Sequence, residues 1–315
     1  MLVTFRDNVT ALSPESRLDL LSEFEGQGLE TGADSDQLRL LAVTISTIED
    51  PGKHPSESTR AVSNILIKLS GRLWLTADYR QFCLIAQCMG LIMRQKPWSM
   101  TQWGIDTAVS AITLTVSPSG PQLAPQHAGP VYQHLCGLMG SILAVHRTKL
   151  GGRYHLIIPL LQGMLRCLFT PDVRRARSAK TISLPPWLSG KGTKLDASSA
   201  AVYARLLTTI CEPTVSSVTS SKNRSRQDLN DETKKVRATA GQYLPYLIME
   251  YSQCQLNARI PPVVKAALMP GLYAVFDVMS QETMRTLNAA MDSSSRAIFK
   301  ALYDDYRRFG KRDQA

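Results

Sequence analysis

Cysteines are few and widely spaced in this 315-residue sequence, and no two of them form a C-x-x-C pair. Most of the six lie inside apolar runs with helical spacing; the six are Cys83, Cys88, Cys136, Cys167, Cys211 and Cys254. Reduced, buried thiols of intracellular proteins have this distribution, whereas zinc sites and small secreted domains group their cysteines. We therefore expect neither a disulfide framework nor a structural zinc site.

Long apolar runs and a leader sequence are also lacking. No uncharged apolar run approaches the roughly 20 residues needed to cross a bilayer, and the opening residues MLVTFRDNVTAL lack the basic stretch and apolar core of a secretory signal. With 44% hydrophobic and 20% charged residues, the chain can fill one long core or two ordinary ones. We expect a soluble protein of the cytosol or nucleus with no membrane partner.

Catalytic motifs are the third absence. His127 and His134 lie seven residues apart without a third ligand at metal spacing, and Asp304 and Asp305 are helix neighbours that point in different directions. Glycine pairs occur, but no phosphate-binding loop with its lysine and no dinucleotide fingerprint follows a strand. An RNA-modifying or hydrolytic enzyme would need a polar pocket with shifted titratable groups. We predict a non-enzymatic protein with no cofactor and no small-molecule substrate.

Helical periodicity is what the sequence does contain. Val131, Leu135, Leu138, Ile142 and Val145 share one helix face, and a second apolar face runs from Tyr154 to Leu168. Gly151 and Gly152 between them supply a helix stop and a tight reversal. The segment 130–169 is therefore predicted to form a helical hairpin.

Similar spacing and capping signals predict helices along the rest of the chain. Their approximate ranges are 14–25, 35–48, 56–69, 77–94, 99–116, 196–210, 228–253, 262–279, a short one after Ser280, and 293–309. The expected N-caps include Ser13, Ser99, Asp196, Ser280 and Asp292, and Gly71 is expected to close the helix 56–69. The inward residues are expected to include Tyr243 and Phe309. Internal prolines at Pro159, Pro245 and Pro270 should bend their helices.

Repeated kinked hairpins without strands predict an all-α fold, a stack of helical hairpins forming an α-solenoid of the armadillo or HEAT type. The segment 117–130 holds four prolines and two glycines and is the expected boundary. We predict an N-terminal helical-repeat region, 1–126, and an all-helical C-terminal domain, 127–311. Two basic irregular inserts, 170–195 and 213–227, are expected to be flexible.

Positive charge is scarce at the start of the chain and abundant later. Residues 1–57 hold eleven acids and four bases, a balance of −7, and because the whole chain carries +10 the remainder carries +17. An anionic partner is therefore expected at the later two thirds. The candidate contacts to RNA phosphates, or to an acidic partner, are Lys149, Arg153, Arg174, Arg175, Arg177, Lys180, Lys222, Arg224 and Arg226.

These cations have two interpretations. They contact RNA phosphates, or they only solubilise the fold and pair with an acidic protein. Aromatic residues, on which single-stranded bases stack, are sparse among them, because only Trp187 lies in the first basic insert. Trp187 itself is expected to pack on its own domain, and the alternative is an anchor for another protein.

Two stretches resemble a known family: LGGRYHLIIPLLQGMLRCLF at Leu150–Phe169, and Met269–Lys311, which begins MPGLYAVFDVMSQETMRTLNAAM. They are similar to the C-terminal domain of the nucleolar pre-ribosomal-associated, or unhealthy ribosome biogenesis, protein family, nearest to the fungal forms of its second member. The resemblance covers roughly Val131 to Lys311. It implies a scaffold of the nucleus and nucleolus, acting in early large-subunit (pre-60S) assembly and pre-rRNA processing, with no catalytic residues.

The implied partners are the pre-ribosomal particle and other nucleolar assembly factors, including a DEAD-box helicase, with direct contact to pre-rRNA left open. The alternative function is a helical-repeat adaptor that binds proteins in transport or trafficking, without RNA contact. A pull-down distinguishes the two, since the first predicts assembly factors and pre-rRNA, and the second predicts cargo or coat proteins.

Overall fold

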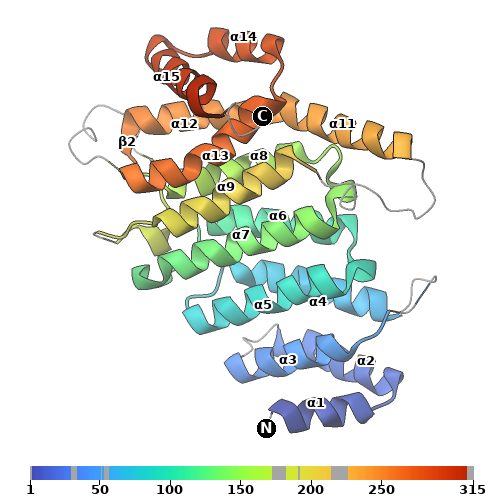
Figure 1. The fold of residues 1–315 in the computed structure, drawn as a ribbon. Coiled ribbons are helices and arrows are strands. Elements are labelled where there is room, and N and C mark those ends of the chain that lie inside the picture. Colours follow the sequence, from blue (N-terminus) through green and yellow to red (C-terminus); the bar gives the residue numbers. More distant parts are fainter. Residues whose placement is uncertain are drawn as a thin grey trace. The chain divides into compact units, whose positions relative to one another are not determined.

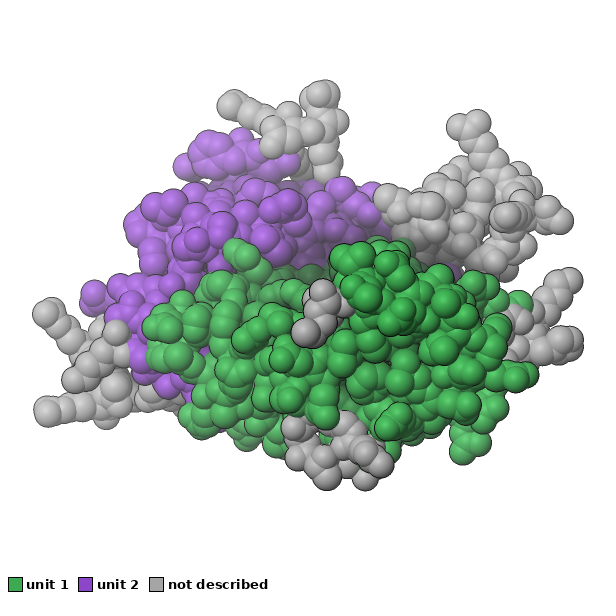
Figure 2. All heavy atoms as spheres, turned by 90° about the horizontal axis from the view of Figure 1, so that it is seen from below, with its two compact units in different colours: residues 1–115, 119–146 green, residues 116–118, 147–315 purple. Residues whose placement is uncertain are grey.

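The computed structural model describes residues 2–29, 34–50, 52, 57–171, 182–190, 192–213 and 226–310. These residues form an all-α fold, as the sequence predicts, apart from a strand pair that the sequence did not predict. In that pair β1 (Thr170–Pro171) runs antiparallel to β2 (Ala258–Arg259). The chain divides into two compact units, unit 1 (Met1–Thr115 and Ser119–His146) and unit 2 (Val116–Pro118 and Arg147–Ala315), coloured separately in Figure 2.

Unit 1 consists of helices that alternate between two layers. Its helices are α1 (Leu2–Ala11), α2 (Pro14–Glu23), α3 (Ser35–Thr47), α4 (Glu57–Leu73), α5 (Tyr79–Gln95), α6 (Gln102–Thr115) and α7 (Ala128–Val145). Three short helical turns accompany them, η1 (Phe24–Gly28), η2 (Pro97–Ser99) and η3 (Pro125–His127). Helices α1, α3, α5 and α7 pack successively in one layer, and α2, α4 and α6 pack successively in the other (Figure 1).

Side-chain caps set most helix starts in unit 1. Ser13 accepts a hydrogen bond from the Ser16 backbone nitrogen, and Asp34 forms a capping box with Gln37. The predicted cap at Ser99 is wrong, because Ser99 belongs to η2 and the Thr101 hydroxyl instead accepts from the Gly104 nitrogen at 3.0 Å. The predicted stop at Gly71 is also wrong, since α4 continues to Leu73.

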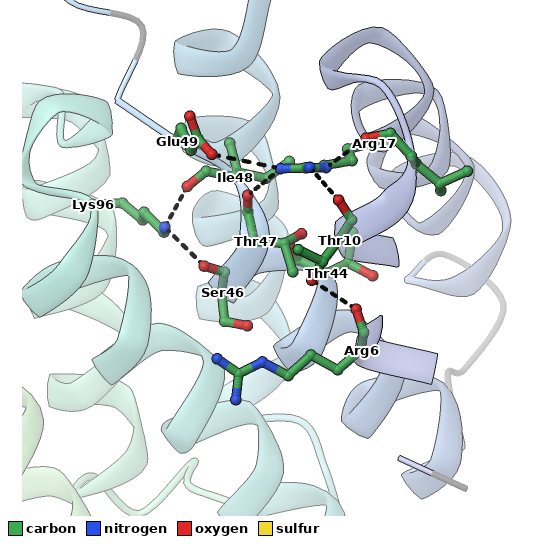
Figure 3. A network of polar contacts seen from close by, with 10 residues as sticks. Arg6, Thr10, Arg17, Thr44, Ser46, Thr47, Ile48, Glu49 and Lys96 are labelled. Carbon is green, nitrogen blue, oxygen red and sulfur yellow. Dashed lines mark hydrogen bonds and ion pairs between the residues drawn. The ribbon is translucent and has the colours of Figure 1, made fainter. Parts of the chain in front are cut away.

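Two cations from other elements close the end of α3 (Figure 3). Arg17 Nη1 donates to the Thr47 carbonyl oxygen at 3.0 Å, and its Nε donates to the Leu12 carbonyl oxygen at 3.1 Å, just beyond α1. Lys96, which is 7% exposed, donates through Nζ to the Ser46 carbonyl oxygen at 3.3 Å. These carbonyl groups lack donors inside their own helices, so the cations stabilise the helix ends.

Unit 2 contains two short turns, η4 (Arg147–Leu150) and η5 (Pro186–Leu188). Its helices are α8 (Tyr154–Cys167), α9 (Ala197–Cys211), α11 (Arg226–Tyr243), α12 (Pro245–Asn257), α13 (Pro262–Val278), α14 (Gln281–Ala290) and α15 (Ser293–Phe309). Asp196, Ser280 and Asp292 cap α9, α14 and α15 through hydrogen bonds to backbone nitrogens, as predicted. Helix α12 contacts both α8 and α15, so it forms the middle of the unit.

Several predictions for unit 2 are wrong in detail. The helix predicted for 228–253 is broken, because α11 ends at Tyr243 and Pro245 opens α12. Proline lacks a backbone N–H and suits the first turn of a new helix. Tyr243 and Phe309, predicted to face inward, are 41% and 60% exposed. Pro159 and Pro270 lie inside α8 and α13, as predicted.

The compact units do not divide the chain at the predicted boundary. Helix α7, which the sequence analysis assigned to the C-terminal domain starting at residue 127, belongs to unit 1. The C-terminal domain at residues 127–311 stays a prediction.

Among the described residues no single helix is long and apolar enough to cross a bilayer. Only α13 together with α14 meets that length and composition, and this pair is bent by 114°.

Candidate functional site

The turn that precedes α8 is held in place by a buried arginine. Arg147 is 6% exposed, and its Nη1 donates to the Ile210 carbonyl oxygen at 3.2 Å, while its Nη2 donates to the Thr209 carbonyl oxygen. These two carbonyl groups belong to the last turn of α9 and have no donor within that helix. Burial lowers the pKa of Arg147. The arginine therefore fixes the turn against the end of α9.

Two of the predicted cations lie on this turn. Lys149 is exposed and Arg153 is half-buried immediately before the first residue of α8. Gly152 between them has a φ of +75°, a left-handed conformation that glycine adopts without steric cost. Partial burial lowers the pKa of Lys149. The structure thus brings Lys149 and Arg153 together, as the hairpin predicts.

Tyrosines from another part of the chain lie beside α8. The Tyr154 and Tyr243 rings stack with centroids 4.9 Å apart and an interplanar angle of 13°. Tyr243 is 41% exposed and Tyr246, in the first turn of α12, is 51% exposed. Gln162 Nε2 of α8 donates to the Tyr246 carbonyl oxygen at 3.3 Å, which ties α12 to α8. We call Lys149, Arg153, Tyr243 and Tyr246 the α8 surface.

The tyrosines of this surface were not predicted from the sequence. Trp187 is the only aromatic residue in the first basic insert, 170–195. Tyr243 contacts Tyr154 because of how α11 and α12 pack in the fold. No local sequence pattern predicts this contact. The available signal was the pair Tyr243 and Tyr246, two aromatic residues three positions apart on either side of Pro245.

The other predicted cations are not brought into this surface by the described structure. Arg174, Arg175, Arg177, Lys180, Lys222 and Arg224 lie outside the described residues, and so does the side chain of Arg226. The described chain stops at Pro171, after the C-terminal end of α8, and resumes at Ile182. Because α8 has 14 residues, that end is about 21 Å from Arg153 along the helix. Arg226 begins α11, about 26 Å along that helix from Tyr243.

Trp187 and Trp103 differ in their exposure to solvent. Trp187 is fully buried in unit 2, so it packs on its own unit, which is the commoner of the two arrangements considered. Its buried ring is not available to a partner. Trp103, near the start of α6 in unit 1, is 67% exposed. No sequence signal distinguished Trp103 from a core tryptophan.

A groove of about 280 Å³ lies between α5 and α7 in unit 1, and its lining includes Gly90, Arg94, His134 and Gly137. Burial lowers the pKa of His134, which lies edge-on to Phe82. His127 instead stacks on Tyr79 with centroids 3.7 Å apart. No group of three or more histidine, cysteine, aspartate or glutamate side chains within the described part of the chain is arranged to hold a metal ion.

Comparisons with known proteins extend over most of the chain. The model described as "Urb2/Npa2 family" matches residues 83–315. A Schizosaccharomyces pombe protein named "Probable nucleolar pre-ribosomal-associated protein 2" is 23% identical over 210 residues, which cover 67% of this chain and 16% of that protein. The chain thus spans about a sixth of that relative's length. No solved structure matches the chain.

The family match includes the whole α8 surface and both stretches that carry the resemblance, 150–169 and 269–311. It covers well over half of the sequence, so the chain belongs to the Urb2/Npa2 family.

Proposed function

We propose that this protein acts in ribosome biogenesis as a non-enzymatic scaffold of the nucleolus, in early large-subunit (pre-60S) assembly and pre-rRNA processing. The observation that carries the proposal is membership of the Urb2/Npa2 family. The name of the fission-yeast relative, a nucleolar pre-ribosomal-associated protein, supports the compartment and the particle.

The architecture of unit 1 supports a scaffolding role. Its helices alternate between two layers, each packing on the helix two positions earlier. We propose that this arrangement is an α-solenoid of the armadillo or HEAT type. Stacked helical repeats present extended surfaces on which several partners can assemble.

The charge distribution supports an anionic partner for the later part of the chain. Residues after position 57 carry +17, and the exposed cation Lys149 lies in unit 2. We propose the pre-ribosomal particle as this partner, together with other nucleolar assembly factors including a DEAD-box helicase. The nine predicted cations, Lys149, Arg153, Arg174, Arg175, Arg177, Lys180, Lys222, Arg224 and Arg226, are proposed contacts to pre-rRNA or to acidic surfaces of the particle.

Depletion of the protein tests this proposal. We expect early large-subunit pre-rRNA precursors to accumulate and free large subunits to decrease, with small-subunit processing less affected. Re-expression of the intact protein should restore both. Normal processing of large-subunit precursors after complete depletion would contradict the proposal.

A protein-binding adaptor in transport or trafficking is the second candidate. The observation that favours a protein-binding surface is Trp103, a large aromatic residue that is 67% exposed on unit 1. Tryptophan is enriched among the residues that dominate protein–protein binding energies. Affinity purification distinguishes the candidates: assembly factors and pre-rRNA support the scaffold, whereas cargo or coat proteins without RNA support the adaptor.

A further inference from the structure

We infer that the α8 surface binds single-stranded RNA, with unstacked bases on Tyr243 and Tyr246 and phosphate groups at Lys149 and Arg153. The choice of RNA rather than DNA rests on the proposed function. The remaining argument depends on the geometry and charge of unit 2.

The tyrosines form a supported stacking surface. Tyr154 is 8% exposed and covers one face of the Tyr243 ring, so the exposed 41% of Tyr243 lies on the side away from Tyr154. Tyr246 follows three positions later and is 51% exposed. Every nucleobase has an aromatic face, and stacking on a protein aromatic ring contributes about 1–3 kcal/mol per base. Because Tyr154 already holds Tyr243, little side-chain entropy is lost when a base stacks there.

The surroundings of these rings carry positive charge. Residues 146–165 and 238–249 contain no aspartate or glutamate. Glu250, the next acid after Tyr246, already pairs with Arg166 through an Nε–Oε1 distance of 2.6 Å. Glu212 is an exposed acid that follows α9, near the carbonyl groups that Arg147 holds. Asp277 of α13 and Arg237 of α11 also lie near Cys211 at the end of α9, and the Asp277 carboxylate accepts a hydrogen bond from the Tyr306 hydroxyl. Lys149, Arg153 and Arg237 outnumber Glu212 and Asp277, so the surface favours a phosphate backbone.

A single strand fits this surface better than a duplex does. Base faces are covered by their neighbours within a duplex, and two cations would give only a small part of the phosphate neutralisation on which duplex binding depends. In a single strand the bases are free to leave the stack and lie on exposed rings. Combined aromatic and cationic contacts are typical of proteins that bind single strands without sequence preference.

Binding of a fluorescently labelled oligouridylate to the 315-residue chain tests the inference. We expect Tyr246→Ala to weaken binding by about 5- to 150-fold, the loss of one stacked base, and Tyr246→Phe to retain affinity because the ring is kept. Lys149→Gln should reduce the slope of log affinity against log salt concentration by about 0.7. Tyr246→Ala should leave that slope unchanged, since it removes no phosphate contact.

Phe309→Ala is the matched control, because Phe309 is an aromatic residue of the same unit that is 60% exposed. We expect it to leave the affinity unchanged. Tyr246 accepts its hydrogen bond from Gln162 through the backbone carbonyl oxygen, which every substitution keeps, so Tyr246→Ala should retain the fold. An unchanged thermal midpoint checks this.

Two outcomes would overturn the inference: no RNA binding by the intact chain, or equal affinities for Tyr246→Ala and the unchanged chain. Loss of a co-purifying protein from cells with Tyr246→Ala, while the purified variant binds RNA normally, would assign the surface to a protein and overturn it as well. The depletion experiment measures pre-rRNA processing independently of these binding measurements. RNA binding by the α8 surface can therefore be disproved while the proposed function stands.

Discussion

Arg17 and Lys96 donate hydrogen bonds to the end of the same helix, although they are separated by most of unit 1 in sequence. Arg17 Nη1 lies 3.0 Å from the Thr47 carbonyl oxygen, and Lys96 Nζ lies 3.3 Å from the Ser46 carbonyl oxygen and also donates to Ile48 (Figure 3). Helix α3 ends without a glycine cap, since Ile48 is in extended conformation. The two cations replace the cap that the local sequence does not provide.

Lys96→Met should destabilise unit 1, because it keeps most of the aliphatic side chain but removes the donor to two carbonyl oxygens. Burial lowers the pKa of Lys96, which shows that the charge is partly desolvated. Removing a desolvated charge is sometimes favourable, but here one buried and one partly buried carbonyl oxygen would lose the Lys96 donor. We expect a loss of about 1–3 kcal/mol, seen as a lower thermal midpoint.

Arg39→Ala is the control for that variant. Arg39 lies on the same helix and pairs with Asp36 at 3.1 Å, but both side chains are substantially exposed. Exposed pairs contribute little, so the change should stay within about 0.5 kcal/mol. Equal midpoints for Lys96→Met and the unchanged chain would show that the Lys96 hydrogen bonds do not stabilise α3.

The helices were predictable from sequence because their signals are local. Apolar residues at helical spacing and capping residues such as Asp196, Ser280 and Asp292 lie within a few positions of the backbone groups they satisfy. Errors arose where tertiary contacts decide the outcome. The start of α6 moved from Ser99 to Thr101, and the helix predicted through Pro245 became two helices.

The candidate site was less predictable, for a physical reason. Lys149 and Arg153 share one turn, so the hairpin pattern was sufficient to place them together. Tyr243 stacks on Tyr154 only because α12 packs along α8 and α11 packs against α9 and α13. Such contacts depend on packing between segments about ninety positions apart, which single-sequence periodicity does not contain.

Gly271→Ala should destabilise unit 2, because α9 and α13 approach each other closely at this glycine. A Cβ atom at position 271 would lie 2.6 Å from the Cα atom of Ala204 and 2.9 Å from its carbonyl oxygen. Both are backbone atoms, so the helices would have to separate. We expect a loss of about 1–3 kcal/mol in the free energy of unfolding, measured with denaturant.

Gly137→Ala should stabilise the protein, in contrast to Gly271→Ala, although both glycines lie in helices of similar length. A Cβ atom at position 137, inside α7, would meet nothing within 4 Å. Alanine should then stabilise the helix by about 0.5–1 kcal/mol, because it loses less backbone entropy on folding than glycine. A similar loss for both glycine variants would contradict the close helix contact inferred at Gly271.

The two tryptophans Trp187 and Trp103 should behave differently when truncated. Trp187 is fully buried, so Trp187→Ala should cost about 3–5 kcal/mol through lost contacts and an unfilled cavity. Trp103 is 67% exposed, and Trp103→Ala should change stability by no more than about 0.5 kcal/mol. Denaturant unfolding of both variants measures the difference. A large loss for Trp103→Ala would show that its ring supports the fold and is not an open binding surface.

Stability should fall at alkaline pH because buried thiols and phenols resist ionisation in the folded chain. Burial raises the pKa of Cys88 and Cys167 from 9.0 to about 12, and chiefly burial raises that of Tyr154 from 10.0 to about 12. Below pH 9.0 both states hold these protons. Between the unfolded and folded pKa values the unfolded chain releases them first, so the folded state binds more protons and loses stability as pH rises.

Thermal midpoints measured from about pH 8 to about pH 11 check this expectation. The midpoint should change little below pH 9 and decrease above it, each group contributing up to about 1.4 kcal/mol per pH unit. Cys88→Ala removes one of the groups and should make the decrease shallower, whatever its effect on the midpoint at neutral pH. A midpoint that stays constant up to pH 11 would mean that these groups ionise equally well in both states, and therefore that Cys88, Cys167 and Tyr154 are accessible to water in the folded protein.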